Sequence, residues 1–101
     1  CNIKFMDFDK LIHYCYKNDY KNAKHIINNI NNSGYSIIDI YEFFFNYIKY
    51  TNKLSDNTKF NLLPIICKYI TIFHNIHEDN IELELFIFDI IKELQTLDKI
   101  L

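Results

Sequence analysis

Hydrophobic side chains recur at spacings of three and four residues along most of the chain, which is the period of an α-helix with one buried face. The first helix is predicted from the series Phe5, Phe8, Leu11, Ile12 and Cys15, and it ends near Lys17. Asn18 or Asp19 then offers a side-chain cap for a second helix. The apolar line of this second helix is Tyr20, Ala23, Ile26 or Ile27, and Ile30.

A Gly-Tyr-Ser turn separates the second helix from the third. Gly34 suits the left-handed backbone in which many helices end. Ser36 and Asp39 have the spacing of a capping box, with Asp in place of the usual Glu, so a third helix begins at Ser36 and runs to about Thr51.

Two further polar breaks divide the rest of the chain. The first break covers residues 52–57 and contains Ser55 and Asp56, either of which would cap a fourth helix running toward His74. Because Pro64 lies inside this helix, we expect a kink or a later start. The break 75–80 precedes a fifth helix, capped by Asp79 with Glu82 and ending near Leu94. The segment 81–85 alternates like a strand, but the residues after it return to helical spacing.

Sparse turn residues favour helices over strands. The 101 residues contain one Gly and one Pro, whereas a β-protein of this size needs a tight turn every 8 to 12 residues or so. With 50% hydrophobic and 17% aromatic residues the chain is not disordered. The predicted fold is all-α, a compact bundle of about five helices forming a single domain over residues 1–101.

The third and fifth predicted helices are apolar on more than one face. In the third, the strongly polar residues form one narrow stripe, namely Asp39, Glu42, Asn46 and Lys49. Helices of this kind either lie at the centre of a bundle or share a face with another chain. The candidate subunit-interface residues are Phe43, Phe44, Tyr47, Leu85, Phe86 and Phe88.

Charge and cysteine content narrow the class of protein. The net charge is −2 and all 11 basic residues are Lys, so a concentrated positive face for nucleic acid is not expected, and Lys17, Lys21 and Lys24 indicate a solvated helix face. No apolar run approaches the length that spans a membrane. Three cysteines without CxxC spacing are typical of reduced thiols inside a cell.

No catalytic, cofactor or metal site emerges from the residue pattern. His74 and His77 form a pair without a distant third ligand, so a helix-end role is favoured over a zinc site or a small metal-dependent enzyme. His13 and Cys15 are two residues apart on a helix and point in different directions. Asp7 with Asp9 fails as an acid–base pair for the same reason.

One block of the chain resembles a known family. Asp19-Tyr20, Ala23 and Ile26-Ile27, followed by Gly34-Tyr35-Ser36 and Ile37-Ile38-Asp39, are similar to the C-terminal domain of replication factor C small subunits, the clamp-loader AAA+ family. The similarity continues more loosely to the Leu83-Glu84-Leu85 region, so that it spans about Phe5 to Leu94. Gly34, Tyr35, Ser36 and Asp39 are the turn and cap residues that it picks out, with Tyr35 expected to pack over the preceding helix end.

The resemblance implies an oligomerising collar domain. Its partners would be the other subunits of a hetero- or homopentameric clamp loader, and ATP and Mg²⁺ would bind in an upstream AAA+ module. A sliding clamp and primer-template DNA would meet that missing region, in a nucleus or a viral replication compartment. The chain begins with Cys1, so we expect a piece of a longer polypeptide. The alternative is a free-standing helical protein-interaction adaptor.

Overall fold

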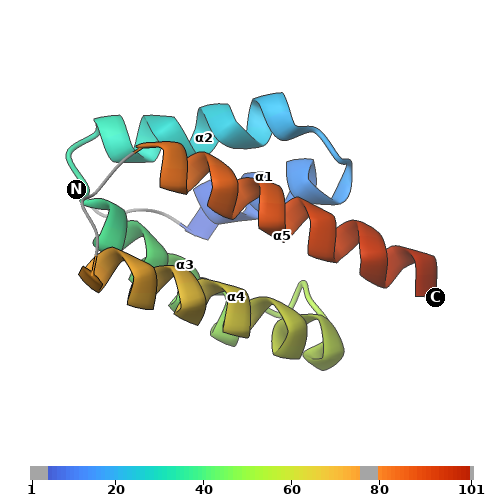
Figure 1. The fold of residues 1–101 in the computed structure, drawn as a ribbon. Coiled ribbons are helices and arrows are strands. Elements are labelled where there is room, and N and C mark those ends of the chain that lie inside the picture. The colour runs from blue at the N-terminus through green and yellow to red at the C-terminus, as the bar shows by residue number, and fades with distance from the viewer. Residues whose placement is uncertain (1–4, 76–79, 101) are drawn as a thin grey trace.

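Five α-helices make up the fold over residues 5–75 and 80–100, the part of the chain that the computed structural model describes (Figure 1). They are α1 (Phe5–Tyr16), α2 (Tyr20–Asn32), α3 (Ile37–Tyr50), α4 (Asp56–Asn75) and α5 (Asn80–Ile100). No strand occurs in these two ranges. The predicted all-α fold of five helices is confirmed.

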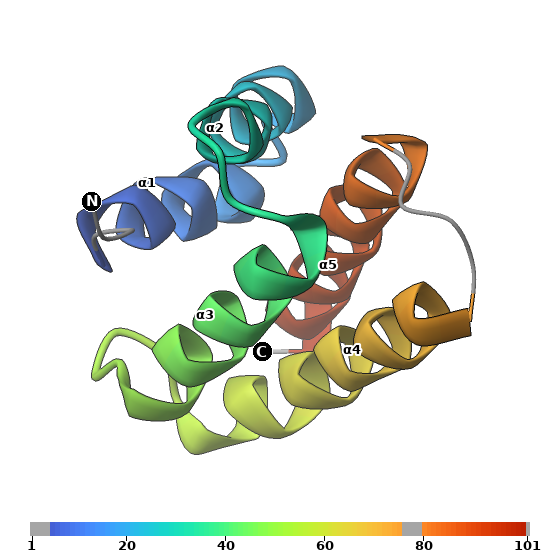
Figure 2. The same ribbon diagram turned by 90° about the vertical axis from the view of Figure 1, so that its left-hand side faces the viewer.

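Two helical hairpins enclose the last helix. Helices α1 and α2 pack against each other, as do α3 and α4, and α5 contacts α1, α2 and α4 (Figure 2). This position explains why α5 is rich in apolar residues: its buried side chains pack against α1, α2 and α4, and one of them also meets rings of α3. They are Leu83, Phe86, Ile87, Ile90, Ile91 and Leu94.

An aromatic cluster joins the α3–α4 hairpin to α5. The ring centroids of Tyr41 and Phe86 are 4.7 Å apart, those of Tyr69 and Phe86 5.2 Å, and those of Phe44 and Phe86 5.7 Å. Tyr69 also donates a hydrogen bond of 2.5 Å from its hydroxyl to Asp89 Oδ2 on α5. Tilted and edge-on ring pairs of this kind stabilise a core beyond the area that they bury.

Side-chain caps lie at the starts of α2 and α4, where the sequence predicted them. Asp19 caps α2 by accepting from the backbone N–H of Asn22 at 3.2 Å. Of the two residues considered for α4, Ser55 makes the cap, because its Oγ accepts from Thr58 N–H at 3.2 Å. Helix α4 begins at Asp56 and continues through Pro64, so the alternative of a later start was wrong. Leu62 and Ile66, both fully buried, anchor the turns on either side of Pro64.

Helix α5 is longer than predicted, and it explains the strand-like alternation. It continues about six residues past Leu94 to Ile100, over a stretch without Gly or Pro that a helix extends at little cost. Leu83 is fully buried, whereas Ile81 and Leu85, one turn apart, lie on the opposite, exposed face. The alternation therefore reflects two apolar faces of one helix. The proposed cap Asp79 lies outside the described residues.

Candidate subunit interface

The turn between α2 and α3 has the geometry that its residues require. Gly34 has a φ of +107°, a conformation that strains any residue with a Cβ. Ser36 caps α3, since its Oγ accepts from the backbone N–H of Asp39 at 3.1 Å. Asp39 lies in the first turn of α3, where a carboxylate interacts favourably with the helix dipole.

Tyr35 joins this turn to the helix that follows it. Its half-buried ring meets Phe43 of α3 edge-on, with centroids 6.1 Å apart. The expected packing of Tyr35 over the end of the preceding helix stays a prediction. Phe43 remains 43% exposed, so this pair leaves apolar surface on the outside of the bundle.

Three exposed apolar side chains form a line on α5, which we call the α5 stripe. Ile81, Leu85 and Phe88 are 62%, 48% and 53% exposed. Spacings of four and three place them on one face, opposite the buried side of the helix. Further along the same face the exposed residues are polar, namely Lys92 and Thr96, so the apolar part is confined to the first half of α5.

Contacts with α2 border the α5 stripe. The ring of Tyr20 meets Phe88 edge-on at 6.2 Å, and its hydroxyl donates to the carbonyl of Glu84 at 3.5 Å. Lys24 Nζ lies 3.8 Å from the Glu84 carboxylate. A partly exposed ion pair of this kind contributes little to stability, so the packing of Tyr20 against Phe88 is the firmer contact between α2 and the stripe.

The structure corrects three of the six expected interface residues. Phe44, Tyr47 and Phe86 are 0%, 1% and 0% exposed, and they belong to the core of this chain. They are therefore not available to a neighbour. The helical period explains the error, because one edge of a wide apolar arc faces inward and the other faces outward, and the sequence does not show where the bundle closes. Phe43, Leu85 and Phe88 remain candidates.

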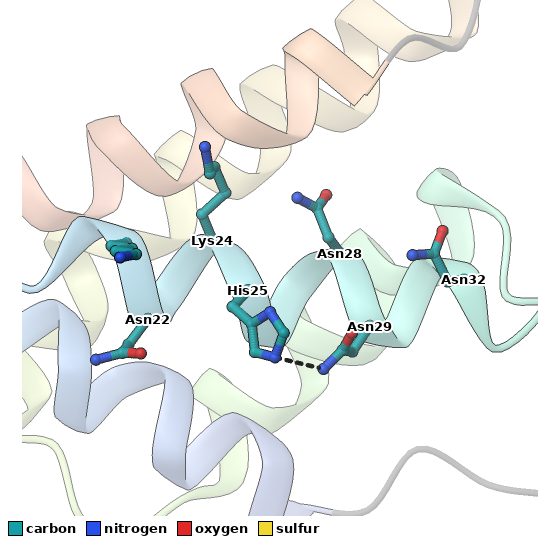
Figure 3. A pocket seen from close by; sticks show the side chains of 7 residues that line it. Asn22, Lys24, His25, Asn28, Asn29 and Asn32 are labelled. Atoms are coloured by element: carbon teal, nitrogen blue, oxygen red, sulfur yellow. Dashed lines mark hydrogen bonds between the residues drawn. The ribbon is translucent and has the colours of Figure 1, made fainter.

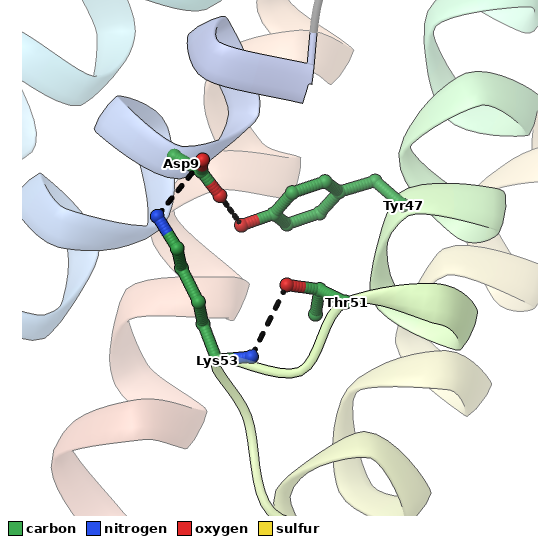
Figure 4. A network of polar contacts seen from close by, with 4 residues as sticks. All are labelled: Asp9, Tyr47, Thr51 and Lys53. Carbon is green, nitrogen blue, oxygen red and sulfur yellow. Dashed lines mark hydrogen bonds and ion pairs between the residues drawn. The ribbon is translucent and has the colours of Figure 1, made fainter.

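Tyr47 instead links α3 to α1 through a side-chain hydrogen bond. Its hydroxyl donates a hydrogen bond to Asp9, which also accepts from Lys53 Nζ at 3.0 Å (Figure 4). The bond from Tyr47 holds the pKa of Asp9 below its ordinary value, aided by Lys53. Burial raises the pKa of Tyr47, and the bond to Asp9 raises it further. The network is structural and lies apart from the α5 stripe.

A polar hollow of about 630 Å³ runs along the outer face of α2 (Figure 3). Its walls come from this helix alone and consist of Lys21, Asn22, Lys24, His25, Asn28, Asn29 and Asn32. The ring of His25 lies 3.2 Å from the Asn29 amide nitrogen. Lys17 and Lys21 are exposed, as expected for a solvated helix face. Lys24 is half-buried and forms an ion pair with Glu84.

None of the chemical alternatives gains support from the geometry. Cys15 is fully buried and burial raises its pKa to about 12, so the thiol stays protonated, while His13 is exposed. Among the residues that the structure describes, no three His, Cys, Asp or Glu side chains converge as metal ligands. His77 and the side chain of His74 lie outside that part. Within it, no helix combines the length and apolarity needed to cross a membrane.

Sequence comparison identifies the family. The model of the replication factor C C-terminal domain matches residues 4–71, which is about two thirds of the chain and includes the Gly34-Tyr35-Ser36 turn. The chain belongs to this family and represents a clamp-loader C-terminal domain. Neither the curated proteins nor the solved structures give a match. Helix α5, with its stripe, lies beyond the matched segment, and the looser similarity to Leu94 remains a prediction.

Two apolar features were missed at the level of sequence. Ile81 belongs to the α5 stripe, and its spacing from Leu85 and Phe88 was the available signal. The second is a line on α4 formed by Phe60, Leu63, Cys67 and Ile70, at spacings of three, four and three. Phe60 and Cys67 are exposed, whereas Leu63 and Ile70 are half-buried and pack against the core. Pro64 hides this line in the sequence, since a helix interrupted there would not align these four residues.

Proposed function

We propose that this domain is the collar of a clamp-loader small subunit, and that the α5 stripe is a surface through which it assembles with other subunits. The observation that carries the proposal is the exposure of Ile81, Leu85 and Phe88 on one face of a helix whose opposite face is fully buried. Membership in a family of clamp-loader C-terminal domains supplies the class of partner.

The size of the stripe supports a role in assembly. Complete burial of one such side chain is worth about 1.5 to 3 kcal/mol. Because each of the three is about half exposed, covering the stripe recovers roughly 2 to 5 kcal/mol. This gain offsets only part of the cost of association, so the stripe would act together with further contacts.

In this proposal, the nucleotide-binding site lies outside these 101 residues. A phosphate-binding loop needs several glycines, and Gly34 is the single glycine of these 101 residues. Gly34 lies in a helix-ending turn. The residues present do not fit ATP and Mg²⁺, and we place both in an AAA+ module upstream in the same polypeptide. The sliding clamp and primer-template DNA would act on that region.

Co-purification tests the proposal. In the full-length gene product, Leu85→Asp places a charge at the centre of the stripe and should abolish recovery of the other clamp-loader subunits. Thr96→Asp is the matched control, because Thr96 is exposed on the same face beyond the apolar part. Equal recovery with the Leu85→Asp and wild-type proteins would reject the α5 stripe as an assembly surface.

The coding sequence upstream of Cys1 discriminates the collar from a free-standing adaptor. The collar predicts an open reading frame that continues upstream and encodes a P-loop roughly 200 or more residues earlier. A complete reading frame that begins within a few residues of Cys1 and encodes no ATPase motif would favour the adaptor.

A further inference from the structure

The α1–α2 hairpin exposes basic and amide side chains but no acidic one. Over residues 7–33 the three carboxylates are half-buried, and every exposed side chain is a lysine, a histidine, an asparagine or a serine. The α3–α4 hairpin, in contrast, exposes three acidic residues, namely Asp39, Glu42 and Asp56. The exposed basic residues of the α1–α2 hairpin are Lys10, His13, Lys17, Lys21 and His25. We call these five residues the α1–α2 basic face.

The net charge of −2 is an average over two unequal parts of the chain. Five of the 11 lysines precede Gly34, but only three of the 13 acidic residues do. Two of these three carboxylates are used within the fold, since Asp9 accepts from Tyr47 and Lys53 and Asp19 caps α2. A charge asymmetry between parts of a chain is a signal of contact with a polyanion. The average over the whole chain is why the sequence predicted no concentrated positive face.

The basic residues form two neighbouring lines on helices that pack side by side (Figure 2). Lys10, His13 and Lys17 have spacings of three and four residues, which place them on one side of a helix. The N–H of Lys17 donates to the carbonyl of His13 at 3.2 Å, so the helical turn continues just past the end of α1. On α2, Lys21 and His25 are four residues apart and form the second line.

At one end of the hairpin, the two lines meet at Asn29. Lys10 of α1 and Asn29 of α2 line the same hollow, of about 340 Å³, together with the half-buried Asp7. Asn29 also lines the polar hollow along α2, where its amide nitrogen lies 3.2 Å from the ring of His25 (Figure 3). Lys10 and His25 therefore border one continuous polar surface.

At the other end, the two lines meet at Asp19. Its carboxylate accepts from the side-chain amide of Asn22 at 2.7 Å and from the backbone N–H of the same residue at 3.2 Å. These bonds lower the pKa of Asp19, and the charges of Lys21 and Lys17 lower it further. Both lysines therefore lie close to this carboxylate, whose charge is already used at the N-terminus of α2.

We propose that the α1–α2 basic face binds the phosphate backbone of a nucleic-acid duplex without reading its sequence. Lysine ammonium groups neutralise phosphates, and asparagine amides donate to phosphate and sugar oxygens. Asn22, Asn29 and Asn32 are exposed on the helix that carries Lys21 and His25. The chain has no arginine, so the commonest contact that specifies guanine is missing. This surface is separate from the α5 stripe, and its role goes beyond the proposed function.

The composition of the α1–α2 basic face favours a duplex over a single strand or a membrane. Single-stranded nucleic acid is bound largely by stacking of its bases on aromatic rings, and helices that lie on membranes insert apolar side chains. The three tyrosines of the hairpin and Ile26 are half-buried, so no Phe, Tyr or aliphatic side chain of residues 7–33 is exposed. Charge and amide groups remain for contact, and these suit a phosphate backbone.

The α1–α2 basic face is long enough to meet several phosphates. At a rise of 1.5 Å per residue, the line from Lys10 to Lys17 extends about 10 Å, and α2 from Lys21 to Asn32 extends about 16 Å. One strand of a duplex presents a phosphate for roughly every 3.4 Å of the axis, so about three to five phosphates lie within these lengths. We expect each of the three exposed lysines to contact one phosphate.

Salt dependence of binding tests the proposal. In fluorescence anisotropy, the 101-residue chain should bind a labelled DNA duplex of about 20 base pairs, and a duplex of unrelated sequence should bind equally well. Contacts to three phosphates predict a slope of about −2.7 for the logarithm of the binding constant against that of the salt concentration. Raising the salt from about 50 to about 200 mM should therefore weaken binding roughly 40-fold. Absence of binding at about 50 mM salt would overturn the proposal.

Two charge-matched triple variants test the position of the binding surface. The combination of Lys10→Gln, Lys17→Gln and Lys21→Gln should weaken binding at least about tenfold at low salt and bring the slope close to zero. The control combines Lys49→Gln, Lys68→Gln and Lys92→Gln, which removes the same charge from exposed positions on α3, α4 and α5. It should keep the wild-type slope. Equal losses from the two triple variants would show that only the total charge matters and would reject this surface. Circular dichroism establishes that each variant is folded.

A single added charge gives a second comparison. Asn29→Asp places a carboxylate where the two lines meet and should weaken binding of the duplex several-fold, by repulsion from the phosphates. Asn46→Asp adds the same charge at an exposed position on α3 and should have a much smaller effect. Equal effects of the two substitutions would contradict the assignment.

Competition identifies the class of partner. An unlabelled duplex should displace the labelled one at a concentration at least about tenfold lower than that of poly-glutamate or of a single strand of equal length. Equal competition by poly-glutamate would assign the surface to an acidic protein, and equal or stronger competition by the single strand would assign it to unpaired nucleic acid. Either result would overturn the proposal and leave the proposed role of the α5 stripe untouched.

Discussion

The change Tyr47→Phe removes a single hydroxyl group from the centre of α3. Its ring contacts with Phe8 at 5.5 Å and Phe44 at 6.1 Å should persist, because phenylalanine has the same ring. The variant therefore removes only the hydroxyl, together with its hydrogen bond to Asp9 and its side-chain hydrogen bond with Thr51 (Figure 4).

The expected loss follows from the surroundings of Asp9. A hydrogen bond to a charged group contributes about 1.5 to 3 kcal/mol. The Asp9 side chain is 28% exposed and keeps Lys53 Nζ at 3.0 Å, so water and the lysine compensate part of the loss. We expect Tyr47→Phe to lower the free energy of unfolding by about 1.5 kcal/mol at pH 7.

The pH dependence has a defined sign. The pKa of Asp9 is lowered in the folded state, chiefly by Tyr47, so at moderately acidic pH the unfolded state binds more protons at this residue. The stability that this carboxylate provides is complete above its unfolded pKa of about 4. It is lost as the pH falls through the lower folded pKa. In the Tyr47→Phe variant this acid loss should be smaller.

Urea denaturation at a series of pH values from 7 down to about 2.5 measures both effects. Tyr50→Phe is the matched control, since Tyr50 lies on the same helix and is exposed. An unfolding free energy within about 0.5 kcal/mol of wild type, with an unchanged acid response, would refute the role of the network. Unchanged association of Tyr47→Phe would agree with its position inside the core.

Three further changes test the helix junctions by thermal or urea unfolding. Gly34→Val should lower the free energy of unfolding by about 1 to 3 kcal/mol. This loss comes from backbone strain alone, because a Cβ at this position meets no atom within 4 Å. An unchanged melting temperature would contradict the positive φ. Gln95→Ala should cost about 1 to 2 kcal/mol, since the Gln95 amide donates to two carbonyls at the end of α1 at 3.2 and 2.9 Å. Thr96→Ala should be nearly neutral, and equal losses from the two would argue against that cap. Tyr35→Ala should cost about 1 to 2 kcal/mol, less than a core aromatic, because its ring is half-buried; a loss above 3 kcal/mol would place the ring deeper.

Local signals made most of the helical architecture predictable. Ser36 and Gly34 each depend on neighbouring backbone, so local sequence predicted the ends of the helices that they border. For the other two caps the sequence left two candidates each, Asn18 or Asp19 and Ser55 or Asp56, and the structure selects Asp19 and Ser55. In contrast, Gln95 closes the end of α1 from a position about 80 residues away in the chain, and nothing near it in the sequence indicates this contact.

The candidate interface was only partly predictable. A wide apolar arc predicts surplus hydrophobic surface, and the surplus exists, but the arc alone does not separate inner from outer residues. On α3, Phe43 and Phe44 are adjacent in the sequence, yet one is 43% exposed and the other fully buried. That difference depends on where α5 inserts between the hairpins, which is a long-range feature of packing.

Burial of the α5 stripe in the assembled clamp loader is the central claim, and thiol labelling measures it most directly. With Cys1→Ser and Cys67→Ser as background, Leu85→Cys in the full-length protein should react with a maleimide at least tenfold more slowly in the purified complex than in the free subunit. Thr96→Cys should react at similar rates in both states. Equal reactivity of Leu85→Cys in the complex and in the free subunit would contradict the account.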